Sequence, residues 1–252
     1  MNKQNSLGSA LITGAAGGIG KAIAKEFSDS GYKVIATDIV KQPKDLDCDF
    51  YIQADLAKTV VDEIYANKIF EKIRTTLDNQ SLNVLINNAA IQILRSTDNL
   101  TREDWQRTLN TNLLAPFIWT QTFLPELEKS KGNVVNISSI HANLTKKNFV
   151  AYATSKAALS GMTKAMAVDL GGRIRINAIE PAAIETEMLK SGFSGKPELY
   201  SQLENCHPQQ RIGKPKEVAK LALVLSDSEI QFMHGAIIGL DGAISGKLFD
   251  PD

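Results

Sequence analysis

The stretch TGAAGGIG, residues 13–20, decides the fold because of its place in the chain. It overlaps the end of a short apolar run, residues 9–14, which predicts a β-strand, and it opens an amphipathic segment, residues 18–30, which predicts an α-helix. Glycines at such a junction allow a tight turn and a close approach of the backbone to a ligand, and the first N–H groups of the helix attract a pyrophosphate. A glycine-rich turn alone can be no more than a turn, but at the first strand-to-helix junction it predicts a dinucleotide site. The residues expected to hold the cofactor here are Gly14, Gly18, Ile19 and Gly20.

Short apolar runs alternate with longer amphipathic ones along the rest of the chain. The pattern predicts strands at 9–14, 32–38, 50–55, 83–90, 133–139, 173–181 and 236–242. It predicts helices at 18–30, 58–78, 101–128, 151–170 and 215–226. Repeated β-α units are typical of a parallel sheet covered by helices on both faces. We therefore expect an α/β fold with one Rossmann-type, doubly wound sheet of about seven strands, formed by a single domain over residues 1–252.

Two local features refine this prediction. Residues 39–49, which include Pro43, barely suffice for a parallel crossover, so no full helix is expected between the second and third strands. Thr101 and Asp104 have the spacing of a capping box, which predicts the start of the long helix.

Composition excludes several classes of protein. Lys+Arg and Asp+Glu number 28 each, so the formal net charge is zero, which argues against a nucleic-acid-binding protein. No apolar run is long enough to span a bilayer, and the first residues lack the apolar core of a signal peptide, so a cytoplasmic, soluble protein is expected. Cys48 and Cys206 form no CxxC motif and the histidines are scattered, so no metal site is expected.

Asp38 ends the second predicted strand, 18 residues after Gly20. That spacing is close to the one at which an acidic residue meets the adenosine ribose of a dinucleotide. Alone, Asp38 would be a strand-end aspartate in a turn. Beside the glycine-rich turn it predicts a carboxylate that accepts from the ribose hydroxyls and repels the 2′-phosphate of NADP. No arginine lies in the turn or directly after Asp38, and the nearest cation is Lys41, so the predicted cofactor is NAD.

Tyr152 and Lys156 lie one helical turn apart in VAYATSKAALSGM, residues 150–162. Positions i and i+4 share a helix face, so the phenol and the ammonium point the same way. The pair alone does not distinguish a surface helix with a stray charge from a tyrosine whose pKa is tuned by a cation.

Taken together, the motifs resemble those of the classical short-chain dehydrogenase/reductase family over essentially the whole chain. The matching segments are TGAAGGIG (13–20), Asp55 after the third strand, NNAA (87–90), Asn112 in NTNLLAPF, Ser139 in NISS, YATSK (152–156), NAIEP (177–181), RIGKPKEVA (211–219) and HGAIIGLDGA (234–243). Each could arise by chance, but their order and spacing are specific to the family. The resemblance implies NAD(P)-dependent oxidation of an alcohol or reduction of a carbonyl.

The resemblance also implies roles for individual residues. By matching position, the catalytic group would be Asn112, Ser139, Tyr152 and Lys156. Further cofactor contacts would come from Asp55, Leu56, Asn88, Ala89, Tyr152, Lys156, Pro181, Ile184 and Thr186. Asp55 would meet the adenine, Asn88 the cofactor ribose region and Thr186 the nicotinamide amide. Ala90 and Ala182 stand where the family usually has glycine, and the methyl group of Ala182 is expected to narrow the substrate side of the nicotinamide pocket.

The chemistry needs a proton carrier, because hydride transfer to a carbonyl leaves an alkoxide. The positive charge of Lys156 is expected to lower the pKa of Tyr152, so that the phenol acts as an acid in reduction and as a base in oxidation. Ser139 would donate a hydrogen bond to the substrate oxygen, although alone it would be an ordinary strand-end serine. Pro116 cannot donate to the carbonyl of Asn112, which predicts a free carbonyl able to hold a water, a simple helix kink, or both.

The substrate pocket carries less information. Ile91, His141 and Ala182 are expected to line it, although His141 is equally well explained as a loop histidine without function. The segment 182–210 is long for a connection and suits a mobile lid over the substrate. The substrate itself and the physiological direction of the reaction are not encoded in a recognisable pattern.

The sequence thus predicts an NAD-dependent oxidoreductase that transfers a hydride between nicotinamide and a secondary alcohol or carbonyl substrate. An NADP-dependent carbonyl reductase of the same fold is the alternative, followed by a protein that senses NAD(H) without turnover. Apolar and small residues in the helices at 101–128 and 151–170, together with the resemblance, predict a homo-oligomer, either a dimer or a tetramer. The only other partner expected is a small-molecule substrate, with no nucleic acid, membrane or metal.

Overall fold

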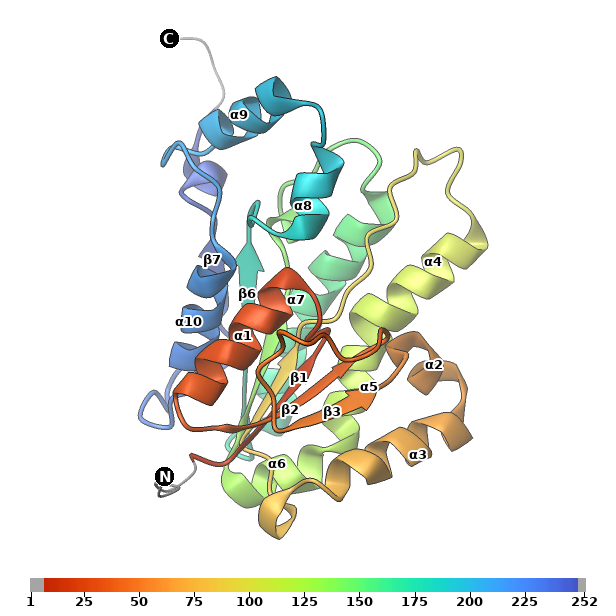
Figure 1. Cartoon of the computed structure of the whole chain (residues 1–252), viewed down its shortest axis with the longest axis vertical. Coiled ribbons are helices and arrows are strands. Elements are labelled where there is room, and N and C mark those ends of the chain that lie inside the picture. The colour runs from red at the N-terminus through yellow and green to blue at the C-terminus, as the bar shows by residue number, and fades with distance from the viewer. Residues whose placement is uncertain (1–6, 249–252) are drawn as a thin grey trace.

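A computed structural model describes residues 7–248 of the chain, and its seven strands form one parallel sheet (Figure 1). The strands are β1 (Ser9–Thr13), β2 (Lys33–Asp38), β3 (Phe50–Gln53), β4 (Val84–Asn87), β5 (Asn133–Ile137), β6 (Arg175–Pro181) and β7 (Ile237–Leu240). Their spatial order, β3-β2-β1-β4-β5-β6-β7, reverses direction between β1 and β4. This is the predicted doubly wound sheet, and a crevice for a ligand is expected where the order reverses. Residues 1–6, on which the expectation about a signal peptide partly depends, lie outside the described residues.

Helices cover both faces of the sheet because successive strand residues point to opposite sides. In β1, Ala10 and Ile12 pack in the apolar cluster that includes α1 (Gly18–Asp29) and α10 (Pro215–Leu225). Leu11 belongs to the second cluster, on the other face. The helices that contribute to that cluster are α2 (Leu56–Val61), α3 (Glu63–Arg74), α5 (Ala115–Thr122), α6 (Leu124–Ser130) and α7 (Val150–Leu170).

The region between β3 and β4 differs from the prediction of one helix over 58–78. It forms two helices, α2 and α3, which meet at Asp62. Asp62 has an extended backbone, with φ −126° and ψ 95°, and its side chain accepts a hydrogen bond from the backbone N–H of Tyr65 at 2.9 Å. An N-cap aspartate stabilises the first turn of a new helix, which explains why α2 does not continue.

The long helix predicted over 101–128 is also interrupted. It begins as α4 (Arg102–Leu109) with the predicted capping box of Thr101 and Asp104. A π-helical turn, Asn110–Leu114, follows, and α5 begins just before Pro116. Proline lacks the N–H that would continue an α-helical ladder, so the widened turn before it accommodates the missing bond. The α-helix is therefore interrupted by the π-helical turn that contains Asn112.

Two connections between elements differ in their content of helix. Between β2 and β3 the described chain forms no helix, as predicted from the short spacing of residues 39–49. The segment 182–210, in which no helix was predicted, contains α8 (Glu187–Gly192) and α9 (Pro197–Cys206). Pro197 lies in the first turn of α9, where its fixed φ and missing N–H are tolerated.

Candidate active site

The carboxyl edge of the sheet collects most of the residues that the sequence singled out. The glycine-rich turn follows β1, Asp38 ends β2, and Asp55 follows β3. Asn88 follows β4 and Ser139 follows β5. Because the strands are parallel, all these ends meet at one edge, on either side of the point where the strand order reverses.

The turn after β1 has the shape of an anion cradle. Gly14 has a φ of +63°, and a Cβ on it would lie 2.6 Å from the Cα of Ala89. A Cβ on Gly20 would lie 2.1 Å from the carbonyl oxygen of Gly14, so a side chain cannot occupy either position. Helix α1 begins after Gly17, which has no side chain to cap the first N–H groups. These N–H groups and the helix dipole fit the pyrophosphate of a dinucleotide.

Asp38 is joined directly to this turn. Its Oδ2 accepts a hydrogen bond from the backbone N–H of Ala16 at 2.9 Å, and its Oδ1 accepts from the N–H of Val40 at 3.3 Å. The two bonds fix the carboxylate beside the glycine-rich turn. Its remaining lone pairs are available to donors such as ribose hydroxyls.

Asn88 and Ala89 hold the turn from the β4 side. The side-chain amide of Asn88 donates to the carbonyl oxygens of Thr13 at 3.0 Å and Gly14 at 2.9 Å. The hydroxyl of Thr13 accepts from the backbone N–H groups of Asn88 and Ala89 at 3.0 and 3.1 Å. Asn88 therefore shapes the cradle through its amide donors, a role that the sequence did not reveal.

Asp55 and Leu56 lie at the start of α2. Asp55 is its N-cap and accepts from the backbone N–H of Lys58 at 3.2 Å. The backbone N–H of Ala54 donates to the carbonyl of Asp38 at 2.8 Å, which brings this turn next to the end of β2. The side chain of Leu56 is buried in the core, so its backbone is the part that faces the edge of the sheet.

Pro181, Ile184 and Thr186 follow one another across the end of β6. Pro181 pairs with Leu240 of β7, and Ile184 is buried against Gly213. Thr186 caps α8, and its Cγ2 lies 3.0 Å from the position of a Cβ on Gly18. The start of the 182–210 segment therefore lies directly beside the N-terminus of α1.

Tyr152 and Ser139 are brought together from different elements. Ser139 follows β5 and is buried, whereas Tyr152 lies in the first turn of α7. Burial raises the pKa of Tyr152 above its usual value, and a hydrogen bond with the Ser139 hydroxyl lowers it by less. The lowering of this pKa expected from Lys156 stays a prediction, because in the described structure the cost of burying a phenolate outweighs the favourable bond to Ser139.

Lys156 is itself buried, with 2% of its surface exposed. Its Nζ donates to the carbonyl oxygen of Ile137 at 2.7 Å and lies 5.7 Å from the centroid of the Tyr152 ring. Burial lowers the pKa of Lys156 from 10.5 to about 7. A lysine with this pKa is only partly charged at neutral pH, which limits its effect on the phenol.

Asn112 supports the site rather than touching the Tyr152 side chain. Its Oδ1 accepts from the backbone N–H of Ile91 at 2.8 Å, and its Nδ2 donates to the carbonyl of Ile91 at 2.9 Å. Nδ2 also donates to the hydroxyl of Ser155 at 3.0 Å, and that hydroxyl donates to the carbonyl of Tyr152 at 2.7 Å. The side chain of Asn112 thus joins the π-helical turn to α7 and to the backbone of Ile91, which follows β4.

Of the predicted substrate residues, His141 contacts the Tyr152 ring directly, and Ile91 is linked to Tyr152 only through Asn112 and Ser155. The His141 ring stacks on Phe149 with centroids 4.2 Å apart, and its centroid lies 5.7 Å from that of Tyr152. Burial, with a smaller contribution from Lys146, lowers the pKa of His141 from 6.5 to about 4, so the imidazole is neutral at physiological pH. Ile91 reaches the site through Asn112, as described above.

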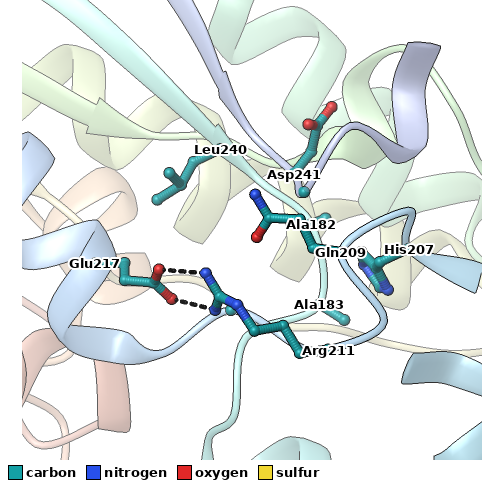
Figure 2. Close-up of a pocket in the computed structure, with 10 residues that line it drawn as sticks. Ala182, Ala183, His207, Gln209, Arg211, Glu217, Leu240 and Asp241 are labelled. Carbon is teal, nitrogen blue, oxygen red and sulfur yellow. Dashed lines mark hydrogen bonds and ion pairs between the residues drawn. The ribbon is translucent and has the colours of Figure 1, made fainter. Parts of the chain in front are cut away.

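Ala182 lies at the end of β6 and borders a cavity of about 100 Å³ (Figure 2). Figure 2 shows Arg211 and Glu217 paired on one side of this cavity, with His207, Gln209 and Asp241 around it. Arg211 binds Glu217 through two hydrogen bonds of 2.7 and 2.8 Å, which fix the chain that follows the 182–210 segment.

Two residues of the site escaped the sequence analysis. Phe149 packs against Tyr152 with ring centroids 6.1 Å apart, and Ser155 links Asn112 to Tyr152. Both lie three positions from Tyr152, on the neighbouring helix turn, so the i ± 3 rule could have indicated them.

In residues 7–248, no helix is both long and apolar enough to cross a bilayer.

Comparison with known proteins assigns the family. The chain matches the family model described as enoyl-(acyl carrier protein) reductase over residues 14–245. It is 36% identical over 243 residues to the 3-oxoacyl-[acyl-carrier-protein] reductase FabG of Thermotoga maritima, which covers 93% of this chain and 96% of that protein.

Two solved structures share the fold. A 4-hydroxyisoleucine dehydrogenase complexed with NADH superposes with a TM-score of 0.85 and 29% identity, over 97% of this chain and 100% of the other. The structure of ElxO with NADP bound superposes with a TM-score of 0.84 and 28% sequence identity. The match covers 95% of this chain and 99% of the other. The fold and the cradle define a nicotinamide-dependent oxidoreductase acting on alcohol or carbonyl groups. The chain belongs to the short-chain dehydrogenase/reductase family.

Proposed function

We propose that this enzyme transfers a hydride between NAD(H) and a secondary alcohol or carbonyl substrate, with Tyr152 as the proton carrier. The observation that carries the proposal is the meeting of Tyr152, Ser139 and Lys156 at the carboxyl edge of the sheet. They come from the end of β5 and from α7, and the buried Lys156 makes no ion pair within the described residues. A buried lysine beside a half-buried tyrosine costs stability, and active sites are where such costs are found.

The nicotinamide, when bound, supplies or accepts the hydride. In reduction, Tyr152 donates its phenolic proton to the substrate oxygen as negative charge develops there. In oxidation, the phenolate accepts the proton from the alcohol. The Ser139 hydroxyl donates to the same substrate oxygen and orients it toward Tyr152. Because burial favours the protonated phenol, Tyr152 is prepared for reduction at neutral pH.

The residues that would hold the cofactor fit a dinucleotide. Gly14, Gly18, Ile19 and Gly20 form the cradle for the pyrophosphate, and Asp38 would accept from the adenosine ribose. Asp55 and Leu56 would lie at the adenine, and Asn88 and Ala89 at the ribose region. Pro181, Ile184 and Thr186 would lie at the nicotinamide, with Tyr152 and Lys156 facing its ribose.

We assign NAD rather than NADP on the position of Asp38. The carboxylate is fixed beside the turn by the N–H of Ala16, where a 2′-phosphate would meet its negative charge. The similar structures include one with NADH and one with NADP, so the fold accepts both cofactors and the choice depends on residues at this position.

The segment 182–210 would act as a lid. It starts beside Gly18, and its α8 and α9 are joined by a short turn in which Phe193 packs edge-on against Tyr200. Ile91, His141 and Ala182 would line the substrate side. The neutral imidazole of His141 and the ring of Phe149 would give this wall an aromatic character.

The enzyme would work in the cytoplasm as a dimer or tetramer. Large apolar side chains are exposed on α5 and α7, with Phe117 38% exposed and Val168 86% exposed. A second copy covering these helices would bury them. Light scattering that shows a stable monomer at micromolar concentration would contradict this assembly.

The proposed activity is tested with a panel of hydroxyl and carbonyl compounds, following NADH absorbance for the wild type and for Tyr152→Phe. Turnover by the wild type and a loss of at least about 10²-fold in the variant, with NADH binding retained, would support the proton role. Equal turnover by the two proteins would remove Tyr152 from the mechanism. Binding of NADH without turnover on any compound would favour a sensor of NAD(H).

A further inference from the structure

The acidic residue Glu180 is the one carboxylate of β6, and it lies on the same edge as the site described above. Only 6% of its surface is exposed, within a strand whose other residues are almost all buried. The neighbouring Ile179 packs in the apolar cluster of α1 and α10, so Glu180 points to the opposite face, toward α7. A buried carboxylate needs hydrogen-bond donors, and its partners show what it holds.

Both carboxylate oxygens of Glu180 are occupied by neutral donors. Its Oε1 accepts from the hydroxyl of Ser160 on α7 at 2.7 Å. Its Oε2 accepts from the side-chain amide of Asn143 at 2.6 Å. Asn143 belongs to the loop of residues 140–148, which connects Ser139 to α7. Hydrogen bonds to a charged acceptor are short and stronger than neutral ones, so this contact is a firm attachment for the loop.

The network continues from Ser160 into the catalytic elements. The hydroxyl of Ser160 gives its only proton to Glu180, so it accepts from the hydroxyl of Ser138 at 2.8 Å. The Ser138 hydroxyl also donates to the carbonyl of Lys156 at 3.0 Å, so its single proton is shared between that carbonyl and the Ser160 hydroxyl. Glu180 thus joins the loop, the residue before Ser139 and the helix that carries Lys156.

Within the described residues, the loop is also held by a hydrogen bond from the backbone N–H of Arg95 to the carbonyl of Asn148 at 3.1 Å and by the contacts of His141 and Lys146 with the Phe149 ring. The bond of Asn143 to Glu180 is the hydrogen bond that ties the loop to β6. The loop's side chains from Asn143 to Asn148 are exposed. The same loop carries His141, two residues before Asn143, whose ring contacts Phe149 and Tyr152. A release of Asn143 would therefore move the wall of the substrate site while leaving the glycine-rich turn in place.

We propose that Glu180 is a positioning residue that fixes the loop 140–148 through Asn143 and thereby sets the affinity for the substrate. The inference rests on the proposed function for the site, since it assigns the loop to the substrate side. It assigns no contact between Glu180 and either substrate or cofactor.

The test uses a pair of variants that disrupts and then restores the contact. Asn143→Asp places a second carboxylate against Glu180, and repulsion should release the loop more than Asn143→Ala does. Glu180→Gln offers an amide donor to the new carboxylate, so the double variant Asn143→Asp/Glu180→Gln should recover. Glu180→Gln alone should stay near wild type, because its amide oxygen can accept from Asn143 while its N–H₂ donates to Ser160. Leu144→Ala, at an exposed neighbouring position, is the matched control.

Kinetics give one readout. The substrate KM should rise about tenfold in Asn143→Asp, with the dissociation constant of NADH unchanged, and should return toward wild type in the double variant. The proposal is overturned if Asn143→Asp keeps the wild-type KM, or if Glu180→Gln fails to rescue it. Activity in Tyr152→Phe would refute the proposed function instead, without bearing on the attachment of the loop.

Limited trypsin digestion gives a readout that needs no substrate. Lys146 and Lys147 are exposed cleavage sites within the loop, and cleavage requires local opening. Cleavage after these lysines should be at least about fivefold faster in Asn143→Asp than in the wild type, and should slow again in the double variant. Equal cleavage rates in the wild type, Asn143→Asp and Leu144→Ala would show that Glu180 does not fix the loop.

Discussion

The Nζ of Lys156 lies 5.7 Å from the centroid of the Tyr152 ring and donates a hydrogen bond of 2.7 Å to the carbonyl of Ile137. The lysine is therefore held by the end of β5, not by an acidic partner. Burial disfavours the charged form of each side chain. It therefore raises the pKa of Tyr152 and lowers the pKa of Lys156.

The raised pKa of Tyr152 predicts opposite pH dependences for the two directions of the reaction. Oxidation needs the phenolate, so kcat/KM for an alcohol should increase as pH rises from 7 toward 10. Reduction needs the protonated phenol and should be fastest at neutral pH and fall at alkaline pH. Tyr152→Phe should abolish both pH dependences and lower the rate by at least about 10²-fold. A flat profile for oxidation between pH 7 and 10 would contradict the role of the phenol.

Lys156→Met should abolish most of the activity and yet stabilise the folded protein. The folded pKa of about 7 lies below the unfolded value of 10.5, so unfolding takes up a proton between these pH values and wild-type stability increases with pH across that window. The cost of burying the charge is greatest at and below pH 7. Allowing for the lost bond to Ile137, the gain in the methionine variant at pH 6 should be about 2 kcal/mol, or roughly 5 °C in melting temperature.

The control for this prediction is the same measurement at pH 10, without added cofactor. Lys156 is neutral there in the folded protein, so the advantage of the methionine variant should shrink. A difference in melting temperature that stays constant from pH 6 to pH 10 would show that the lysine is not held with a lowered pKa.

Asp38 should determine the choice of cofactor. Catalytic efficiency with NAD should exceed that with NADP by at least about tenfold, because the carboxylate fixed by Ala16 repels a 2′-phosphate. Asp38→Ala combined with Ile39→Arg should shift the preference toward NADP. Asp38→Asn removes the charge and keeps the shape, since an amide oxygen can still accept from the N–H of Ala16. This variant should reduce the preference for NAD over NADP without reversing it. Equal efficiency of wild type with both cofactors would remove Asp38 from this role.

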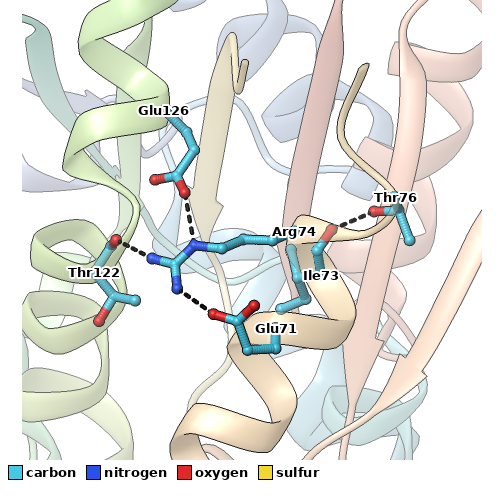
Figure 3. Close-up of polar contacts among 6 residues, drawn as sticks. All are labelled: Glu71, Ile73, Arg74, Thr76, Thr122 and Glu126. Atoms are coloured by element: carbon cyan, nitrogen blue, oxygen red, sulfur yellow. Dashed lines mark hydrogen bonds and ion pairs between the residues drawn. The ribbon is translucent and has the colours of Figure 1, made fainter. Parts of the chain in front are cut away.

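Arg74 should contribute to stability rather than to activity. Figure 3 shows its guanidinium between α3 and α6, where it binds Glu126 through Nε at 2.7 Å, Glu71 at 2.8 Å and the carbonyl of Thr122 at 2.9 Å. The side chain of Glu126 is only 10% exposed, so Arg74→Met leaves a carboxylate without its cation. We expect a loss of about 2 kcal/mol, reduced from the fully buried case because Arg74 is partly exposed.

The double variant Arg74→Met/Glu126→Leu provides the control. Replacing both partners by apolar side chains removes the unpaired charge, so most of the lost stability should return. Urea unfolding measures the free energies, and kcat/KM should be unchanged in both variants. A double variant less stable than Arg74→Met alone would show that the ion pair itself, and not the cost of separating it, stabilises this region.

Much of the fold followed from local patterns. The spacing of apolar residues predicted the seven strands and most helices, because strand and helix periods are properties of short segments. The lack of a helix in residues 39–49 and the capping box of Thr101 and Asp104 were also correctly predicted, since both depend on neighbours in sequence. The break at Asp62 was missed, because the apolar periodicity continues across it, whereas Pro116 indicated an interruption of the long helix near Asn112.

What the sequence by itself determined is the order of elements, the glycine-rich cradle and the set of side chains available for chemistry. What only the tertiary structure decided is how those side chains behave. The pKa of Tyr152 is raised where the helix spacing to Lys156 predicted a decrease, because the cost of burial comes from segments far away in the chain. Likewise, Asn112 binds Ile91 and Glu180 binds Asn143 across 21 and 37 residues. Desolvation and such long-range bonds arise only when the sheet brings distant segments together, so no local pattern can contain them.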